Sequence, residues 1–409
     1  MVGTGVFTTS GLLLSELHSV PAVLLAWVVG GLLAAAGALS YAELVAALPE
    51  NGGEYRLLST IYHPLVGFVA GAVSFVVGFA APIAASALAF GEYAHRVWPE
   101  VSQLPAAIAL LAVMCAVHAG RVGFTGRVQD VLTASKVVLV MALVLGALFS
   151  GDPARLTAAE RPLLSVAFSP SMAVALVFVT FSYSGWNAAA YVAGEVRDPA
   201  RALPRALIAG TGLVTVLYLA INVALFAAAP ADTLSGEVAV GHVAATALFG
   251  ESAGRVLSAV IALGLLSTVG ALIMTGTRVV EAMGRDHGPL AGFARRASGG
   301  GPWVAVLAQG AVALVMVLTA SFEALLGYIG VTLSLFAGLT VVGVIVLRHR
   351  QPDLPRPVLT WGYPLTPLVF AASTLWMIVW SISSRPLAAL AGAGTIAAAA
   401  VGYLVSVRR

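Results

Sequence analysis

Long uninterrupted apolar runs dominate this chain. Ten stretches of at least 20 residues contain no Asp, Glu, Lys or Arg. They are residues 17–42, 57–91, 101–120, 162–194, 206–231, 256–277, 297–322, 324–347, 357–384 and 386–407. Another, 131–151, is interrupted only by Lys136, and residues 1–15 look like the remnant of one more. Because a helix of about 20 apolar residues crosses the hydrocarbon core of a bilayer, each long run predicts a membrane-spanning helix.

These runs and the polar residues between them predict an all-α integral membrane protein. Helices are expected at roughly 5–17, 20–48, 64–97, 104–120, 124–149, 168–194, 203–229, 252–284, 303–320, 322–348, 364–384 and 386–407. The connections are short, so we expect a single transmembrane domain over residues 1–409 and no separate soluble domain.

Composition agrees with this prediction and excludes other classes. Hydrophobic residues make up 60% and charged residues 10% of the chain, against about 45–50% and about 25% in soluble domains. The single cysteine, Cys115, excludes an internal disulfide and a cysteine-based zinc site. The net charge of +3 is scattered, without the basic face that nucleic-acid binding needs. No histidine pair at ligand spacing and no catalytic constellation is present, so we expect no metal, no cofactor and no enzymatic activity.

The arginines are distributed unevenly between the two sides. If the N-terminus is cytoplasmic, fifteen arginines fall inside and five outside. The inner ones are Arg56, Arg121, Arg127, Arg197, Arg201, Arg205, Arg278, Arg285, Arg295, Arg296, Arg348, Arg350, Arg356, Arg408 and Arg409. Because cytoplasmic loops are enriched in basic residues, we expect both termini in the cytoplasm and the protein in the inner (cell) membrane of a bacterium.

Glycine interrupts two of the expected helices. Gly3-Thr4-Gly5 lies at the head of the first helix, and Ser182-Tyr183-Ser184-Gly185 lies in the middle of the sixth. Interruptions at corresponding positions of two halves are typical of inverted repeats with broken helices around a binding site. Glycine also serves close helix packing in membranes, so the spacing alone leaves both interpretations open.

Several motifs, taken in order along the chain, resemble a known family. They are Gly3-Thr4-Gly5-Val6-Phe7, Pro49-Glu50-Asn51-Gly52-Gly53-Glu54-Tyr55, the run from Phe181 to Asn187 that continues to Glu195-Val196-Arg197-Asp198-Pro199, the run from Arg278 to Asp286, and the run from Leu347 to Pro357. Together they are similar to the amino acid–polyamine–organocation (APC) permeases, and most of all to the L-type amino acid transporter branch.

The resemblance implies a LeuT-like fold, a five-plus-five inverted repeat. Residues 1–149 would form the first repeat, 168–348 the inverted second repeat, and 364–407 two peripheral helices, about 12 transmembrane helices in all. Helices 1 and 6 would be broken. Family members carry further residues before the Gly-Thr-Gly break, whereas this chain begins at Met1. Either the native protein is longer, or helix 1 is truncated and its inner half is absent.

The same resemblance implies an amino acid site between the two breaks. Its residues would be Gly3, Thr4, Gly5, Phe181, Ser182, Ser184 and Asn187, with Phe181 as an aromatic gate. The carboxylate and ammonium of a substrate cannot stay unpaired in a low-dielectric site. A helix that starts at the first break offers N–H groups and a positive dipole end to the carboxylate, and the unwound segment at the second offers carbonyls to the ammonium.

Lys136 is the only lysine, and it lies within an apolar helix. The resemblance implies that its ammonium takes the place of the sodium ion of sodium-coupled relatives and contacts the first break. The alternative is a lysine whose long stem reaches the membrane interface. The first interpretation predicts transport that does not depend on sodium.

We therefore expect a secondary active transporter that moves amino acids across the membrane by alternating access, with protons or a counter-transported amino acid as possible partners. The segments expected around the substrate side chain, 80–85, 181–187 and 334–338, carry no charge, so the substrate should be neutral. The alternative is a non-transporting membrane sensor or partner-binding subunit with the same fold. Elsewhere, Glu43 should be solvated at its helix end, and Tyr191 and Asn222 should form hydrogen bonds between helices.

Overall fold

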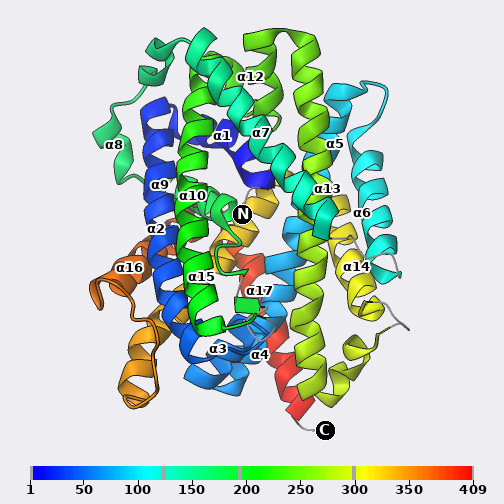
Figure 1. Cartoon of the computed structure of the whole chain (residues 1–409), viewed down its shortest axis with the longest axis vertical. Coiled ribbons are helices and arrows are strands. Elements are labelled where there is room, and N and C mark those ends of the chain that lie inside the picture. The colour runs from blue at the N-terminus through cyan, green and yellow to red at the C-terminus, as the bar shows by residue number, and fades with distance from the viewer. Residues whose placement is uncertain (1–2, 121–125, 189, 192–195, 297–300, 408–409) are drawn as a thin grey trace.

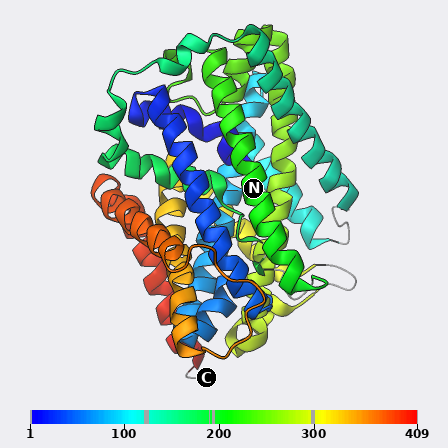
Figure 2. The ribbon, with the colours of Figure 1, turned by 60° about the vertical axis from the view of Figure 1, so that its left-hand side comes forward.

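The helices form one bundle whose members run mostly along its long axis (Figures 1 and 2). The computed structural model describes residues 3–120, 126–188, 190–191, 196–296 and 301–407, and of these not the side chains of 126–133, 136 and 407. In this part of the chain the only β-pairing is an isolated bridge between Ser19 and Ala159. The chain is therefore all-α, as the apolar runs predict.

The described elements follow one another in a simple order. They are α1 (Thr4–Leu17), α2 (Val20–Ala47), α3 (Glu54–Ile61), α4 (Pro64–Val73), the π-helix η1 (Ser74–Ala80), α5 (Ala81–Val97), α6 (Gln103–Ala119), α7 (Gly126–Ser150), the 3-10 helix η2 (Pro153–Thr157), α8 (Leu163–Ala167), α9 (Pro170–Tyr183), α10 (Pro199–Ala228), α11 (Ala231–Leu234), α12 (Val240–Phe249), α13 (Glu251–Asp286), the 3-10 helix η4 (Gly288–Ala294), α14 (Trp303–Thr319), α15 (Phe322–Arg350), α16 (Leu365–Ser384) and α17 (Pro386–Val407).

Most of the expected helices are confirmed, and two kinds of difference appear. The helix expected at 168–194 ends at Tyr183, and the one expected at 64–97 contains the π-helix η1. The helices α3 and α12 were not predicted, because each is short and lies where the sequence suggests a connection. Within the described residues, seven helices are long and apolar enough to span a membrane, and several shorter ones are apolar too.

Serine side chains fix where three of the long helices begin. The Ser19, Ser169 and Ser321 hydroxyls accept hydrogen bonds from the backbone N–H groups of Ala22, Met172 and Ala324, at the starts of α2, α9 and α15. A serine at the N-cap satisfies one of the N–H groups that a helix leaves free at its start. These caps explain why the helices begin at the edges of the apolar runs.

Helix α1 lies inside the bundle. Every residue of α1 except Ser15 and Glu16 is buried. Its start lies about half way along the long axis, whereas the C-terminus lies at the end of the bundle that also holds α3 and α4 (Figures 1 and 2). A helix whose first turn lies in the middle of the bundle can present its free N–H groups to an internal site.

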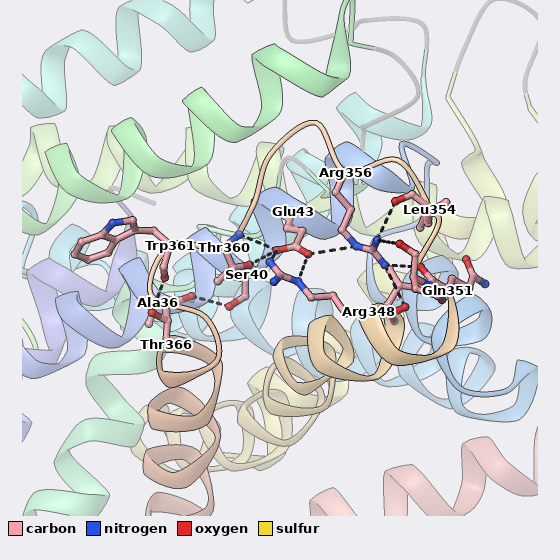
Figure 3. A network of polar contacts seen from close by, with 12 residues as sticks. Ala36, Ser40, Glu43, Arg348, Gln351, Leu354, Arg356, Thr360, Trp361 and Thr366 are labelled. Carbon is pink, nitrogen blue, oxygen red and sulfur yellow. Dashed lines mark hydrogen bonds and ion pairs between the residues drawn. The ribbon is translucent and has the colours of Figure 1, made fainter.

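At the α3 end of the bundle, Glu43 lies at the centre of a network of charged and polar groups (Figure 3). Its carboxylate accepts hydrogen bonds from Arg348 Nε and Nη2 at 2.8 and 2.7 Å. It also accepts them from the backbone N–H and the hydroxyl of Thr360, both at 2.7 Å, and Arg356 Nε lies 3.6 Å away. The side chain of Glu43 is only 2% exposed. The expectation that Glu43 is solvated is therefore wrong, because residues about 300 positions away cover it.

Candidate functional site

A cavity lies where the start of α1 meets the end of α9. Its volume is about 570 Å³. All seven residues expected to contact a substrate line it, namely Gly3, Thr4, Gly5, Phe181, Ser182, Ser184 and Asn187. The two interrupted segments are far apart in the sequence, and the fold brings both of them to the same cavity.

The two segments touch directly at Gly5. A Cβ atom built on Gly5 would lie 2.5 Å from both Cα and Oγ of Ser182. The Ser182 hydroxyl in turn donates a hydrogen bond to Thr9 Oγ1 at 3.0 Å. Only glycine lets α1 and α9 approach so closely, which explains the glycine in the first motif.

The start of α1 presents backbone N–H groups at the cavity. The N-cap residue, Gly3, has no side chain that could accept from these groups, and Gly3, Thr4 and Gly5 all line the cavity. The Thr4 and Ser86 hydroxyls are 2.6 Å apart, which ties this first turn to α5. A helix start with unsatisfied N–H groups and a positive dipole end is suited to an anion such as a carboxylate.

The end of α9 presents carbonyl groups. After Tyr183 the chain leaves the helix, and Gly185 takes a φ of 95°. The Phe181 carbonyl accepts from Ser184 N–H at 2.9 Å, and the Ser182 carbonyl accepts from the Tyr218 hydroxyl at 3.0 Å. These contacts hold the last turn of α9 in place while its negative dipole end faces the cavity.

The remaining wall is largely apolar. Side chains of α2, α15 and α16 contribute to it, among them Leu33, Ile329, Phe336, Phe370 and Met377. Phe181, only 5% exposed, belongs to the same wall. Such a surface is suited to an uncharged group.

The π-helix η1 forms another part of the wall through Ser74, Gly78 and Phe79. Single π-helical turns inside α-helices occur frequently at functional sites. The three uncharged segments expected around a substrate side chain also contribute lining residues, with Pro82 from the first and Ser334 from the third.

Sequence reasoning missed one charged residue of this cavity. Glu54, the first residue of α3, lines the cavity and is 4% exposed. Its carboxylate accepts hydrogen bonds from Tyr41 at 2.8 Å and from Asn187 Nδ2 at 2.6 Å, and also from the Tyr191 hydroxyl. The motif Gly52-Gly53-Glu54-Tyr55 was recognised, but nothing in its spacing placed it at the cavity.

Two expected hydrogen-bonding residues do connect helices. The Tyr191 hydroxyl contacts Glu54 and lies 3.2 Å from Ser74 Oγ. Asn222 on α10 accepts a hydrogen bond from Ser10 on α1 at 2.5 Å. The prediction of an interhelical hydrogen bond is confirmed for Asn222, whereas Tyr191 reaches α3 and η1 from the segment after α9.

The side chain of Lys136 lies outside the described residues, so its expected contact with the first break stays a prediction. Its neighbour on α7, Val137, lines the cavity. Among the described side chains, no group of three or more His, Cys, Asp or Glu residues is arranged to hold a metal ion.

Charged and aromatic groups gather where α3 meets the end of α13. The Tyr55 hydroxyl donates to Asp286 at 2.5 Å, and Asp286 pairs with Arg56 at 2.9 Å. Burial, and then the neighbouring Asp286, raise the pKa of Tyr55 far above its usual value, so Tyr55 remains a donor at physiological pH. This contact fixes α3, and with it Glu54, against α13.

Comparison with known proteins shows the family. The sequence profile of the amino acid permease family matches residues 1–405. The chain belongs to this family. The family match identifies it as an amino acid permease. Together with the long apolar helices, the match also identifies it as a multi-pass integral membrane protein.

Individual relatives agree with this assignment. The chain is 30% identical to the large neutral amino acids transporter small subunit 2 of Oryctolagus cuniculus, over 93% of this chain and 73% of that protein. It is 29% identical to the serine/threonine exchanger SteT of Bacillus subtilis, over 92% and 87%. It is 30% identical to the Asc-type amino acid transporter 1 of Mus musculus, over 97% and 76%. The expected resemblance to the permease family is thereby confirmed.

Proposed function

We propose that this permease transports neutral amino acids by alternating access, with the substrate bound in the cavity between α1 and α9. The observation that carries the proposal is the meeting of a helix start and a helix end at one cavity of about 570 Å³. An α-amino acid carries an anionic and a cationic group at opposite sides of one carbon, and two opposed helix ends complement both.

In this proposal the substrate carboxylate binds the N–H groups of Gly3, Thr4 and Gly5. The ammonium binds carbonyls at the end of α9, between Phe181 and Ser184, and Asn187 contacts the substrate from the segment beyond. Phe181 acts as the gate over the site. Backbone groups then neutralise both charges of the substrate, and no charged side chain is required.

The neutral substrate class is supported by the walls of the cavity. Glu54 is the only Asp, Glu, Lys or Arg among the described lining residues, and both of its oxygens already accept hydrogen bonds. A dicarboxylic side chain would meet no cationic side chain among these residues, which costs several kcal/mol, and the only carboxylate that a cationic side chain would meet already accepts three hydrogen bonds. Two of the relatives are named for large neutral amino acids and for serine and threonine, in line with this class.

A LeuT-like inverted repeat is part of the same proposal. The interruptions at the start of α1 and after α9 would be the broken helices of the two repeats. The end of the bundle that holds α3 would face the cytoplasm, because Arg56, Arg285, Arg348 and Arg356 lie there or next to it.

Uptake into proteoliposomes tests the transport proposal. Purified protein is reconstituted, and uptake of radiolabelled alanine is measured with and without internal alanine, and with and without a sodium gradient. We expect uptake that is stimulated by internal substrate, is inhibited by leucine or serine, and is insensitive to sodium. Inhibition by arginine or glutamate as strong as by leucine would contradict the neutral class.

The same assay separates the alternative function. A membrane sensor or partner-binding subunit with this fold would bind an amino acid, seen as a raised unfolding temperature, but would show no uptake above empty liposomes. An enzyme would convert the amino acid instead, which thin-layer analysis of the label detects. Neither outcome is expected, because the named relatives are transporters.

Lys136 is proposed to replace the sodium ion of coupled relatives. Lys136→Ala should reduce alanine uptake at least tenfold while leaving the protein folded, since a compact charge near the start of α1 would be lost. Lys136→Arg should rescue poorly, because a planar guanidinium does not replace an ammonium. Parental uptake by Lys136→Ala, or uptake that requires sodium, would contradict this role.

A further inference from the structure

The α-helical hydrogen bonding of α9 does not continue through residues 184–187 of the cavity wall. These residues form turns, and the next described backbone bonds are short-range ones such as Ala188 N–H to Gly185 O at 3.1 Å. A segment with few backbone hydrogen bonds of its own depends for its position on contacts from other elements. The side chains that anchor it therefore determine the geometry of this wall.

Two of those anchors come from the segment itself. Trp186 packs its ring edge-on against Tyr41 of α2, with centroids 4.7 Å apart. Asn187 donates to Glu54 at 2.6 Å. Both anchors are connected to Glu54, because Tyr41 also donates a hydrogen bond to the Glu54 carboxylate, at 2.8 Å.

A third anchor is Tyr191, which contacts α3, η1 and the loop before α3. Its hydroxyl contacts Glu54 and Ser74, and its ring packs edge-on against Phe79 with centroids 5.3 Å apart. Its backbone carbonyl accepts from Gly52 N–H at 3.4 Å. Tyr191 is only 6% exposed.

The backbone before Glu54 is shaped to receive this ring. Gly53 takes a φ of 54°, a conformation that favours glycine, and a Cβ atom built there would lie 2.5 Å from a carbon of the Tyr191 ring. Each residue of the Gly52-Gly53-Glu54 stretch thus contacts Tyr191. Gly52 does so through its backbone N–H, Gly53 through its close approach to the ring, and Glu54 through its carboxylate. This is a second observation, independent of the hydrogen bonds of Glu54, that couples the loop before α3 to the wall of the cavity.

We propose that Glu54 is a positioning residue of the substrate site: its carboxylate holds Asn187 and Tyr191, and thereby fixes the 184–187 wall of the cavity for binding. The inference rests on the proposed function, because it presumes that the amino acid binds against this wall. Glu54 acts through its neighbours, since its two oxygens are already occupied by Tyr41, Asn187 and Tyr191.

A carboxylate is suited to this role because it only accepts hydrogen bonds and can accept several at once. Three donors from α2 and from the segment after α9 converge on it. A glutamine at this position keeps one oxygen but replaces the other with an amide N–H₂, so the bonds to a charged acceptor are lost and the Tyr191 hydroxyl would have to accept where it now donates. Glu54→Gln should therefore release the wall with little change in side-chain volume.

The experiment compares three single substitutions by two measurements. The variants are Glu54→Gln, Tyr191→Phe and, as a matched control, Tyr62→Phe. Tyr62 donates to the Leu339 carbonyl at 2.9 Å, so the control also loses one hydroxyl bond between helical elements, away from the cavity lining. Each variant is assayed for its unfolding temperature without substrate and for the KM and maximal rate of alanine uptake.

We expect the KM for alanine to rise about fivefold in Tyr191→Phe and about tenfold in Glu54→Gln, changes that correspond to the net contribution of about one hydrogen bond. The double variant should be no worse than Glu54→Gln by more than about twofold, because both act through one contact. Tyr62→Phe should keep the parental KM even where its unfolding temperature falls as far as that of Tyr191→Phe.

A merely structural role would give a different pattern. If Tyr191→Phe and Glu54→Gln lower the unfolding temperature but keep the parental KM, the inference is wrong. If Glu54→Gln does not fold, Tyr191→Phe alone decides by the same criterion. If the parent protein neither takes up alanine nor is stabilised by it, the proposed function is wrong, and this inference, which rests on it, is wrong too.

Discussion

Two buried glutamates, one in the last turns of α2 and one at the start of α3, have different surroundings. Glu43 is paired with the guanidinium groups of Arg348 and Arg356 (Figure 3), and it is not among the residues that line the cavity. Glu54 lines the cavity, and within the described part of the chain it contacts neutral donors and forms no ion pair. Two carboxylates of similar burial thus serve different purposes.

The difference lies in what each carboxylate connects. Glu43 joins α2 to the end of α15 and to the loop before α16, and Arg348 also stacks on Tyr363 at 3.8 Å. Unfolding has to pull these three elements apart and break all of these contacts, so the network stabilises the fold. Glu54 joins α2 and α3 to an irregular segment that borders the cavity, so its contacts affect the shape of the site. We therefore interpret Glu43, which pairs with arginines, as a residue that stabilises the fold. We interpret Glu54, which is held by neutral donors, as a residue that positions the wall of the cavity.

The largest effect is expected from Glu43→Ala. It leaves the half-buried guanidinium groups of Arg348 and Arg356 without the buried carboxylate that pairs with them, and breaking such a pair costs about 3 kcal/mol of stability. The KM for alanine should not change, because Glu43 does not line the cavity. Denaturant unfolding in detergent, together with uptake by the folded fraction, measures both quantities. A loss below about 1 kcal/mol would show that the network is not structural.

An intermediate effect is expected from Gly53→Ala. The added methyl group meets the Tyr191 ring and forces an unfavourable backbone conformation, which costs about 2 kcal/mol. The KM for alanine should rise as it does in Tyr191→Phe. The matched control is Gly250→Ala, since Gly250 has a φ of 85° but nothing lies within 4 Å of its Cβ position. The control should lose about 1 kcal/mol by backbone strain alone and keep the parental KM.

The smallest effect is expected from Arg348→Lys. Lysine keeps the positive charge beside Glu43 but loses the two parallel hydrogen bonds and the stacking on Tyr363, which costs about 1 kcal/mol. Uptake should be parental. If Arg348→Lys is instead as unstable as Glu43→Ala, geometry rather than charge pairing dominates this network, and the distinction between the two glutamates becomes weaker.

Much of the fold could be predicted because its main signal is local. The charge-free runs match the long helices, since a membrane span needs only a sufficient length of apolar residues. The interruptions at Gly3-Thr4-Gly5 and Ser182–Gly185 were also visible, and the seven residues expected at the site do line the cavity. The short helix α3 was missed because its composition resembles that of a connection, and α12 was missed because its apolar run is too short for a membrane span.

The partners of the buried charges could not be predicted. Glu43 and Arg348 lie 305 positions apart, and Glu54 and Asn187 lie 133 apart. Sequence spacing shows that a glutamate stands at the end of a helix or in a glycine motif, but burial and pairing depend on which distant elements pack there. Glu43 therefore looked solvated, and Glu54 looked like part of a family motif without a place in the site.

The sequence by itself determined that this chain is an all-α membrane protein, which permease family it resembles, and where two of its helices are interrupted, because hydrophobic length and glycine content act within a few residues. The tertiary structure decided that the two interruptions meet at Gly5 and Ser182, and that Glu43 has charged partners while Glu54 has neutral ones at the cavity. Such contacts arise only when helices pack, since the burial of a charge, and so its role, depends on every element that surrounds it.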